Sequence, residues 1–158
     1  MNRRRVLWLA PAVCALHVAP ARAAVATRPL ELDAWPALRA SLAGRRAIVH
    51  LWGLTCAPCI DELARWAAFI ERHPREAIVM IEVEPAEPRL VDAALRRAGV
   101  RGGRQYAVRG FADERWQHAI DPMWGGELPR TLMLEAAGSA RAFSGPADFD
   151  ALHRWLAG

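Results

Sequence analysis

The sequence predicts a single α/β domain, in which helices flank a mixed sheet built from parallel βαβ units and one antiparallel hairpin. Nearly continuous apolar runs at 47–52 and 77–84 are typical of strands that are buried on both faces. A segment of helical spacing follows each run, which implies parallel connections between the strands. Two short runs at 131–135 and 141–144, joined across Gly138-Ser139, indicate the hairpin.

The first elements lie before the strand at 47–52. Residues 24–29 show no periodic pattern, and we expect a flexible start there. Apolar side chains recur at helical spacing at Trp35, Leu38 and Leu42, which predicts a first small helix over 34–43.

Three further helices and one further strand are expected. A broad apolar stripe over 58–72 predicts a helix with much of its circumference buried. The pattern at 88–98, closed by Gly99, predicts a second helix. A short edge strand is expected at 105–109, and the apolar positions from Phe149 onward mark a closing helix.

The N-terminus has the pattern of an export signal. Residues 1–23 combine an arginine-rich start, a short apolar stretch and an Ala-x-Ala ending, which predicts cleavage after Ala23 and a single mature domain over 24–158. A membrane anchor is the alternative. Its apolar stretch is interrupted by Pro11 and Pro20 and is shorter than the ~20 residues of a spanning helix, so cleavage is favoured. The sequence leaves the export route, general or twin-arginine, open.

The charge of the chain argues against a nucleic-acid partner. The formal net charge is +4, and all 21 basic residues are arginine. Four of them and no acidic residue lie in 1–23, so the mature chain has 17 basic and 17 acidic residues. No basic stripe is present, and we expect no binding of nucleic acid. Because Cys14 lies in the predicted signal, the mature chain has two cysteines.

Those two cysteines form a Cys-x-x-Cys motif at a strand-to-helix junction. A thiolate on Cys56 would lie at the first turn of the helix, where unpaired N–H groups and the helix dipole lower its pKa from about 8.5. Cys56 is therefore the expected nucleophile, and the more shielded Cys59 the thiol that resolves a mixed disulfide. Pro58 suits a first turn because no helical hydrogen bond is lost there.

Other uses of the cysteine pair are disfavoured. A structural disulfide that closes a four-residue loop constrains the unfolded chain little. A zinc site normally needs four ligands, and a single Cys-x-x-Cys supplies two. His118 and Met123 suggest copper binding, but two ligands without a supporting cluster are weak grounds, and we expect no metal site. No nucleotide or flavin motif is present, so no cofactor is expected.

The segment 51–59 (LWGLTCAPC), followed some 70 positions later by Leu128-Pro129 before a strand, resembles the thioredoxin fold. It is similar, more narrowly, to the exported thiol-disulfide oxidoreductases of the TlpA/ResA/DsbE type, over roughly 32–157. The resemblance implies a thioredoxin-like sandwich in which Pro129 is cis and faces the cysteines. It also implies that the Leu128 backbone pairs with an extended substrate.

The same resemblance suggests three supporting residues. Glu62, three positions after Cys59, coincides with an acidic residue near the active site, where it would tune the thiols or relay a proton; the alternative is a solvated acid in the first turn. His50 takes the place of a buried acid in thioredoxin, and either moves the proton of Cys59 or is a satisfied core residue. Trp52 is expected beneath the active-site loop, or simply in the core.

The loop 121–127 leads into Pro129 and is expected to line the substrate groove. Trp124 and Met123 are the residues we expect there. Trp124 would contact a client, although exposed tryptophans near glycines also occur without a binding role.

The resemblance implies a monomeric periplasmic thiol-disulfide oxidoreductase that acts on protein clients. A reductase is favoured, of the type that serves cytochrome c maturation or copper-site assembly, with electrons from a membrane-bound donor. Two alternatives remain: a disulfide oxidase or isomerase of exported proteins, and a non-catalytic docking or metal-delivery module. The Ala-Pro pair between the cysteines does not decide the direction of exchange.

Overall fold

The computed structural model describes residues 26–158, so the predicted signal at 1–23, with Cys14, lies outside the described part. The elements in chain order are β1 (Arg28–Leu30), a 3-10 helix η1 (Leu32–Ala34), α1 (Trp35–Ala40), β2 (Ala47–Trp52), α2 (Ala57–Arg72), β3 (Ala77–Glu82), α3 (Pro88–Arg97), β4 (Arg104–Val108), α4 (Glu114–Ile120), β5 (Arg130–Leu134), β6 (Ala140–Ser144) and α5 (Phe149–Ala157).

The strands form one mixed sheet in the order β1-β4-β3-β2-β5-β6. β1, β4, β3 and β2 run parallel to one another, and β5 pairs antiparallel with both β2 and β6. The helices α2 and α3 connect parallel strands, as expected for βαβ units. The predicted fold class, with parallel βαβ units and an antiparallel hairpin, is confirmed.

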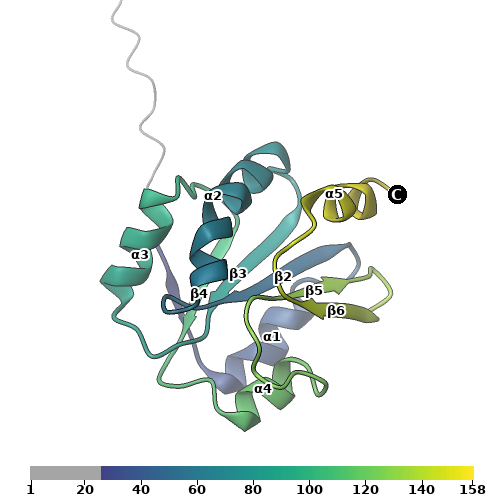
Figure 1. Ribbon diagram of the computed structural model, residues 1–158. Helices are drawn as coiled ribbons and strands as arrows, with labels where there is room; N and C mark the ends of the chain where they lie inside the picture. Colours follow the sequence, from purple (N-terminus) through teal and green to yellow (C-terminus); the bar gives the residue numbers. More distant parts are fainter. Residues whose placement is uncertain (1–25) are drawn as a thin grey trace, which may run out of the picture.

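Helices cover both faces of the sheet (Figure 1). α2, α3 and α5 lie on one face, and α1 and α4 on the other. The position of β2 between the two helical layers explains why its sequence is continuously apolar. Ile48 and Trp52 pack on the α2 side, whereas Val49 and Leu51 pack on the α1 side, so both faces of the strand are buried.

The segment 24–29 was expected to be flexible, and this expectation was wrong for its last two residues. Arg28–Leu30 forms β1, in which Arg28 pairs with Tyr106 of β4. β4 is therefore an inner strand, and the prediction that it forms an edge was also wrong. The strand has three residues, and only Leu30 is buried. Such a segment has no periodic pattern to read, because its pairing depends on a partner 78 positions away.

The sequence reading also missed α4. Asp113 caps this helix by accepting a hydrogen bond from the Trp116 amide at 3.0 Å, and only Trp116 and Ile120 of its residues are buried. A single apolar turn of this kind gives too weak a period to predict. α1 is shorter than expected because η1 precedes it and it ends at Ala40, while the ends of the other predicted elements lie within about two residues of those observed.

Candidate active site

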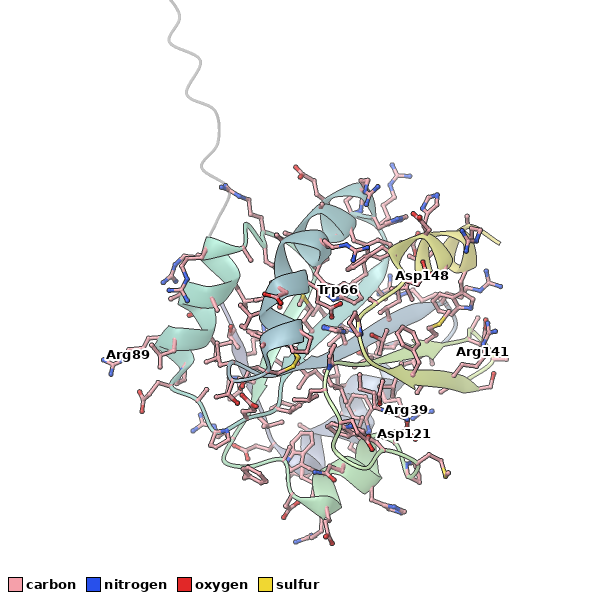
Figure 2. All side chains as sticks on the ribbon, viewed as in Figure 1. Arg39, Trp66, Arg89, Asp121, Arg141 and Asp148 are labelled. Atoms are coloured by element: carbon pink, nitrogen blue, oxygen red, sulfur yellow. A yellow bond between two sulfur atoms is a disulfide. The ribbon has the colours of Figure 1, made fainter. Side chains whose placement is uncertain are left out.

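The Cys56–Cys59 pair forms a disulfide at the start of α2, visible in Figure 2 as a yellow bond at the end of that helix. Cys56 is the N-cap residue, and its Sγ accepts a hydrogen bond from the Cys59 amide at 3.3 Å. Pro58 lies in the first turn, as predicted. Cys56 is partly exposed, whereas Cys59 is fully buried, so the two sulfurs differ in access to a partner.

The peptide bond between Leu128 and Pro129 is cis, as predicted. β5 runs antiparallel to β2, with Arg130 opposite Leu51. Pro129 therefore lies at the edge of the sheet where β2 ends and the cysteine loop begins. Pro129 is buried, and Leu128, half-buried, packs against the apolar clusters of both faces.

Glu62 lies one turn after Cys59 on α2, and its carboxylate is buried among donors from three segments. Oε1 accepts a hydrogen bond from Trp66 Nε1 at 3.1 Å, and Oε2 accepts one from the Ala147 amide at 2.9 Å. His50 Nε2 lies 3.2 Å from Oε1, at ion-pair distance but without the alignment of a hydrogen bond. Glu62 is therefore not a solvated acid of the first turn, and that alternative was wrong.

His50 lies on β2 with no exposed surface. Its Nδ1 is 3.1 Å from Thr131 Oγ1 on β5, and its ring lies against Trp66, with ring centroids 4.3 Å apart. Burial lowers the pKa of His50, and the charge of Glu62 offsets this only in part, so the ring is neutral near pH 7. Burial acts to raise the pKa of Glu62, but the close approach of His50 and the hydrogen bonds from the Ala147 amide and Trp66 outweigh it, and this pKa is lowered.

Trp52 is 1% exposed and shares the apolar cluster of the α2 side with Cys59 and with Leu54 of the loop. This burial agrees with either expectation for the residue, support beneath the loop or a place in the core.

Glu82 is a second buried carboxylate at this edge, and the sequence reading did not single it out. It pairs with Trp52 in the register of β3 against β2 and has no exposed surface. Its Oε1 accepts a hydrogen bond from the Glu84 amide at 3.1 Å, while Oε2 has no partner. Burial raises the pKa of Glu82 to about 7, an effect that the Glu84 amide reduces and the Glu84 charge increases. The detectable signal was an acid inside an otherwise apolar strand.

Glu84 binds the loop that precedes Cys56 in the chain. Its carboxylate accepts hydrogen bonds from the amide and the hydroxyl of Thr55, both at 2.7 Å. A Cβ atom at Gly53 would approach the Glu84 carboxyl carbon to 2.4 Å. The glycine therefore allows the carboxylate to lie against the loop, and the pair fixes the backbone just before Cys56.

The two residues predicted for the substrate groove have different environments. Trp124 is 5% exposed, packs in the α1-side cluster and donates a hydrogen bond from Nε1 to the Glu127 carbonyl at 2.9 Å. The prediction that Trp124 contacts a client was therefore wrong, because the ring is used in the core. Met123 is 85% exposed on the same loop, and its position is compatible with contact to a client.

An ion pair that the sequence reading missed anchors this loop to the sheet. Arg130 Nε donates to Asp121 Oδ2 at 3.0 Å, and its Nη1 donates to Ser144 Oγ at 2.8 Å. Burial acts to raise the pKa of Asp121, but the hydrogen bond from Arg130 outweighs it and the pKa is lowered. Figure 2 shows Asp121 beside Arg39 on the side of the sheet that α4 covers. The ion pair therefore joins the start of the loop to β5, directly after Pro129.

Within residues 26–158, no cluster of three or more His, Cys, Asp or Glu side chains has the arrangement of a metal site. His118 is exposed on α4. In the same range, no helix has the length and apolar character needed to cross a bilayer.

Comparison with known proteins gives a structural answer only. No protein-family model matches the sequence, and the search of curated proteins gives no match. Solved structures do match. A secreted disulfide oxidoreductase of Mycobacterium tuberculosis, described as homologous to E. coli DsbE, has a TM-score of 0.59 at 18% identity, over 75% of this chain and 84% of that one.

Two further structures agree. A thiol:disulfide interchange protein of the thioredoxin family from Chlorobium tepidum has a TM-score of 0.59 at 20% identity, over 75% of this chain and 81% of that one. StoA from Bacillus subtilis has a TM-score of 0.56 at 18% identity, over 72% and 83%. The chain therefore has a thioredoxin fold, like that of solved thiol-disulfide oxidoreductases, with a Cys-x-x-Cys disulfide at the start of its longest helix.

Proposed function

We propose that this chain is an exported, monomeric thiol-disulfide oxidoreductase whose Cys56–Cys59 pair reduces disulfides of protein clients. The mature protein is the single domain 24–158, which works in the periplasm after removal of 1–23. The observation that carries the proposal is the pair itself: a partly exposed sulfur at the N-cap of α2, joined to a buried one. The fold, shared with solved oxidoreductases, supports the proposal.

The reaction proceeds in two exchanges. The Cys56 thiolate attacks one sulfur of a client disulfide, which forms a mixed disulfide and releases one client thiolate. Cys59 then loses its proton and attacks Cys56, which restores the Cys56–Cys59 disulfide and releases the second client thiolate. The client gains two electrons, and its two thiolates take up protons from the solvent. A membrane-bound dithiol donor later returns two electrons and one proton to the pair, which becomes a Cys56 thiolate and a Cys59 thiol, and the second proton of the donor is released. The N-terminus of α2 favours the Cys56 thiolate.

Residues around the cysteine pair bind the client and move the proton of Cys59. The N–H and C=O groups of Leu128 have no backbone partner within 26–158, and they bind an extended client segment as an added strand. Pro129 holds them beside the disulfide. Glu62, one turn after Cys59 on α2, and His50 beside it on β2 accept and return the proton of that thiol.

Insulin reduction driven by dithiothreitol tests the catalytic claim. The native protein is expected to accelerate precipitation of the insulin B chain, and Cys56→Ser to abolish the acceleration. If Cys56→Ala retains the biological activity of the native protein, the chain acts as a docking or metal-delivery module instead. Equilibration with glutathione then gives the reduction potential of the pair and so the direction of thiol-disulfide exchange. A reductase has a reduction potential well below the range of disulfide oxidases.

Covalent trapping tests the partner claim. A Cys59→Ser variant cannot resolve the mixed disulfide, so clients are expected to stay joined to Cys56 in a periplasmic extract. Trapped proteins of cytochrome c maturation or copper-site assembly would support the proposed pathway class. The matched control is Cys56→Ser with Cys59 intact, which should trap far less because Cys59 is buried.

A further inference from the structure

Glu82 is the buried ionisable group that the proposed exchange does not use. It is the last residue of β3, where its register partners are Trp52 on β2 and Ala107 on β4. Alternate residues of β3, such as Met80, belong to the apolar cluster of the α2 side. Because side chains alternate along a strand, Glu82 points to this same side.

This placement puts the carboxyl group on the side of the sheet that also holds Cys59. Trp52, beside Glu82, belongs with Cys59 and Leu54 to one apolar cluster. The carboxyl group accepts a hydrogen bond from the amide of Glu84, whose own carboxylate accepts hydrogen bonds from Thr55 in the loop between β2 and Cys56. Glu82 is thus linked through Glu84 to the backbone that carries the nucleophile, while its Oε2 has no hydrogen-bond partner within residues 26–158.

The charged surroundings of Glu82 offer no compensation for a negative charge. Glu84, on the loop after β3, is the charged group that acts on it, and its sign is the same. β4 faces it with Ala107, and the buried side chains of α3 are apolar. Of the titratable side chains on α2, Cys59 and Glu62 are buried, and Glu62 lies beside His50 of β2. None of the ion pairs formed within 26–158 includes Glu82.

We propose that Glu82 is a positioning residue that takes up a proton when the Cys56–Cys59 disulfide is reduced and releases it when the disulfide forms again. The inference rests on the proposed function, since it requires that the pair cycles between its two redox states. Reduction places a thiolate on Cys56, directly after the loop that Glu84 links to Glu82. This thiolate is a further negative charge near Glu82, which has no cation to offset its own charge, so the carboxylate is neutralised.

The step balances in protons and electrons. Above about pH 7, where Glu82 of the oxidised protein is ionised, the protein receives two electrons and two protons from a dithiol reductant. It becomes a Cys56 thiolate, a Cys59 thiol and a neutral Glu82, and the reductant becomes a disulfide. Without Glu82, the same reduction takes up only the proton on Cys59. The carboxyl group therefore changes how strongly the redox equilibrium depends on pH, and it does so without touching a client.

The test measures protons taken up per disulfide reduced, using the full mature chain in dithiothreitol redox buffers between about pH 5.5 and about pH 8. Each proton changes the reduction equilibrium constant tenfold per pH unit. Between about pH 7 and about pH 8 we expect the pH dependence to approach two protons for the native protein and to stay near one for Glu82→Gln, because below about pH 7 Glu82 already holds its proton in the oxidised protein. Asp61→Asn, which removes an exposed acid from the first turns of α2, is the matched control and should behave as the native protein.

Infrared difference spectra between the oxidised and reduced protein provide a second measurement. The native protein should gain a protonated-carboxylic-acid band on reduction, and Glu82→Gln should lack it. Equal proton numbers in the native protein and a folded Glu82→Gln variant would overturn the proposal. So would the absence of the band in the native protein, which settles the matter even if the variant fails to fold. Both measurements use only the chain's own disulfide. The Glu82 proposal can therefore fail while the protein still reduces insulin, and insulin reduction can fail while proton uptake by Glu82 is still observed.

Discussion

Two buried carboxylates on the α2 side of the sheet, Glu62 and Glu82, differ in their ionisation although both are almost inaccessible, at 3% and 0% exposure. The pKa of Glu62 is lowered, whereas that of Glu82 is raised to about 7. The difference lies in their partners. Glu62 accepts hydrogen bonds from Trp66 and the Ala147 amide and lies beside His50, while one oxygen of Glu82 has no hydrogen-bond partner within residues 26–158. Burial alone therefore does not decide which acid is charged.

The folding environment explains the contrast. Glu62 projects from a helix into the junction of α2, β2 and the loop before α5, where side-chain and loop donors are available. Glu82 projects from an inner strand, whose backbone donors are largely committed to the sheet. The neighbouring helices offer it apolar side chains. The groups around Glu62 keep it ionised, whereas Glu82, with one oxygen unsatisfied, titrates at about pH 7.

The largest expected effect is the loss of the satisfied acid. Glu62→Ala should lower the free energy of unfolding by about 3 kcal/mol at pH 7, because Trp66, the Ala147 amide and His50 lose a buried partner. Chemical denaturation of the oxidised protein measures this. Glu62→Gln, which keeps one acceptor, should cost clearly less. A Glu62→Ala variant as stable as the native protein would show that the donors are satisfied in another way.

Removing the unsatisfied acid should have a smaller effect of opposite sign. Because the pKa of Glu82 is raised from 4.5 to about 7 in the folded protein, its contribution to stability is full below pH 4.5 and is lost as the pH rises to about 7. Glu82→Gln should therefore gain about 2 kcal/mol relative to the native protein over this window. Denaturation at several pH values measures the difference in free energy of unfolding between the variant and the native protein. His50 is present in both proteins, so its titration does not contribute to this difference. A constant difference would contradict the raised pKa.

Asp121 extends the comparison to a paired acid that is only partly shielded. Asp121→Asn should lower the free energy of unfolding by about 1 kcal/mol at pH 7, because the charge-assisted bond from Arg130 is weakened. Since the pKa of Asp121 is lowered, this contribution is present above pH 3.8 and is lost as the pH falls further. The native and variant proteins should thus converge in acid, as followed by thermal unfolding. Divergence at low pH would contradict the assignment.

The smallest expected effect concerns the acid that contacts the loop. Thr55→Val removes the hydroxyl that donates to Glu84 but keeps the amide bond, and should cost about 0.5 kcal/mol. Alkylation of reduced Cys56 is the more sensitive measurement, because the backbone before the nucleophile becomes less constrained. Thr55→Ser retains the hydroxyl and is the control. Equal alkylation rates for Thr55→Val and the native protein would show that the amide bond alone holds the loop.

Sequence patterns predicted most of the fold because the signals are local. The continuous apolar runs of β2 and β3 and the helical stripes of α2, α3 and α5 appear within short windows. The Cys-x-x-Cys at the junction of β2 and α2 is likewise local, and its disulfide and cap geometry match the prediction. The prediction of a cis bond before Pro129 came from family resemblance, not from the pattern of the chain alone.

The sequence-based predictions failed for residues whose role depends on partners distant in the chain. β1 requires β4 to pair with, and Trp124 is buried only because the α1-side helices pack around it. Glu62 could not be separated from a solvated acid, because its partners come from positions as distant as Ala147. For Glu82, no local rule says whether a donor will meet it.

The sequence by itself determined the order of the elements from β2 to β4 and from β5 to α5, the reactive pair Cys56–Cys59 and the helix end at which that pair lies. Each of these depends on periodicity or spacing over a few residues. Only the tertiary structure decided which of the acids near the pair is charged. That outcome depends on how many donors from other segments reach each carboxylate, and only folding brings these segments together.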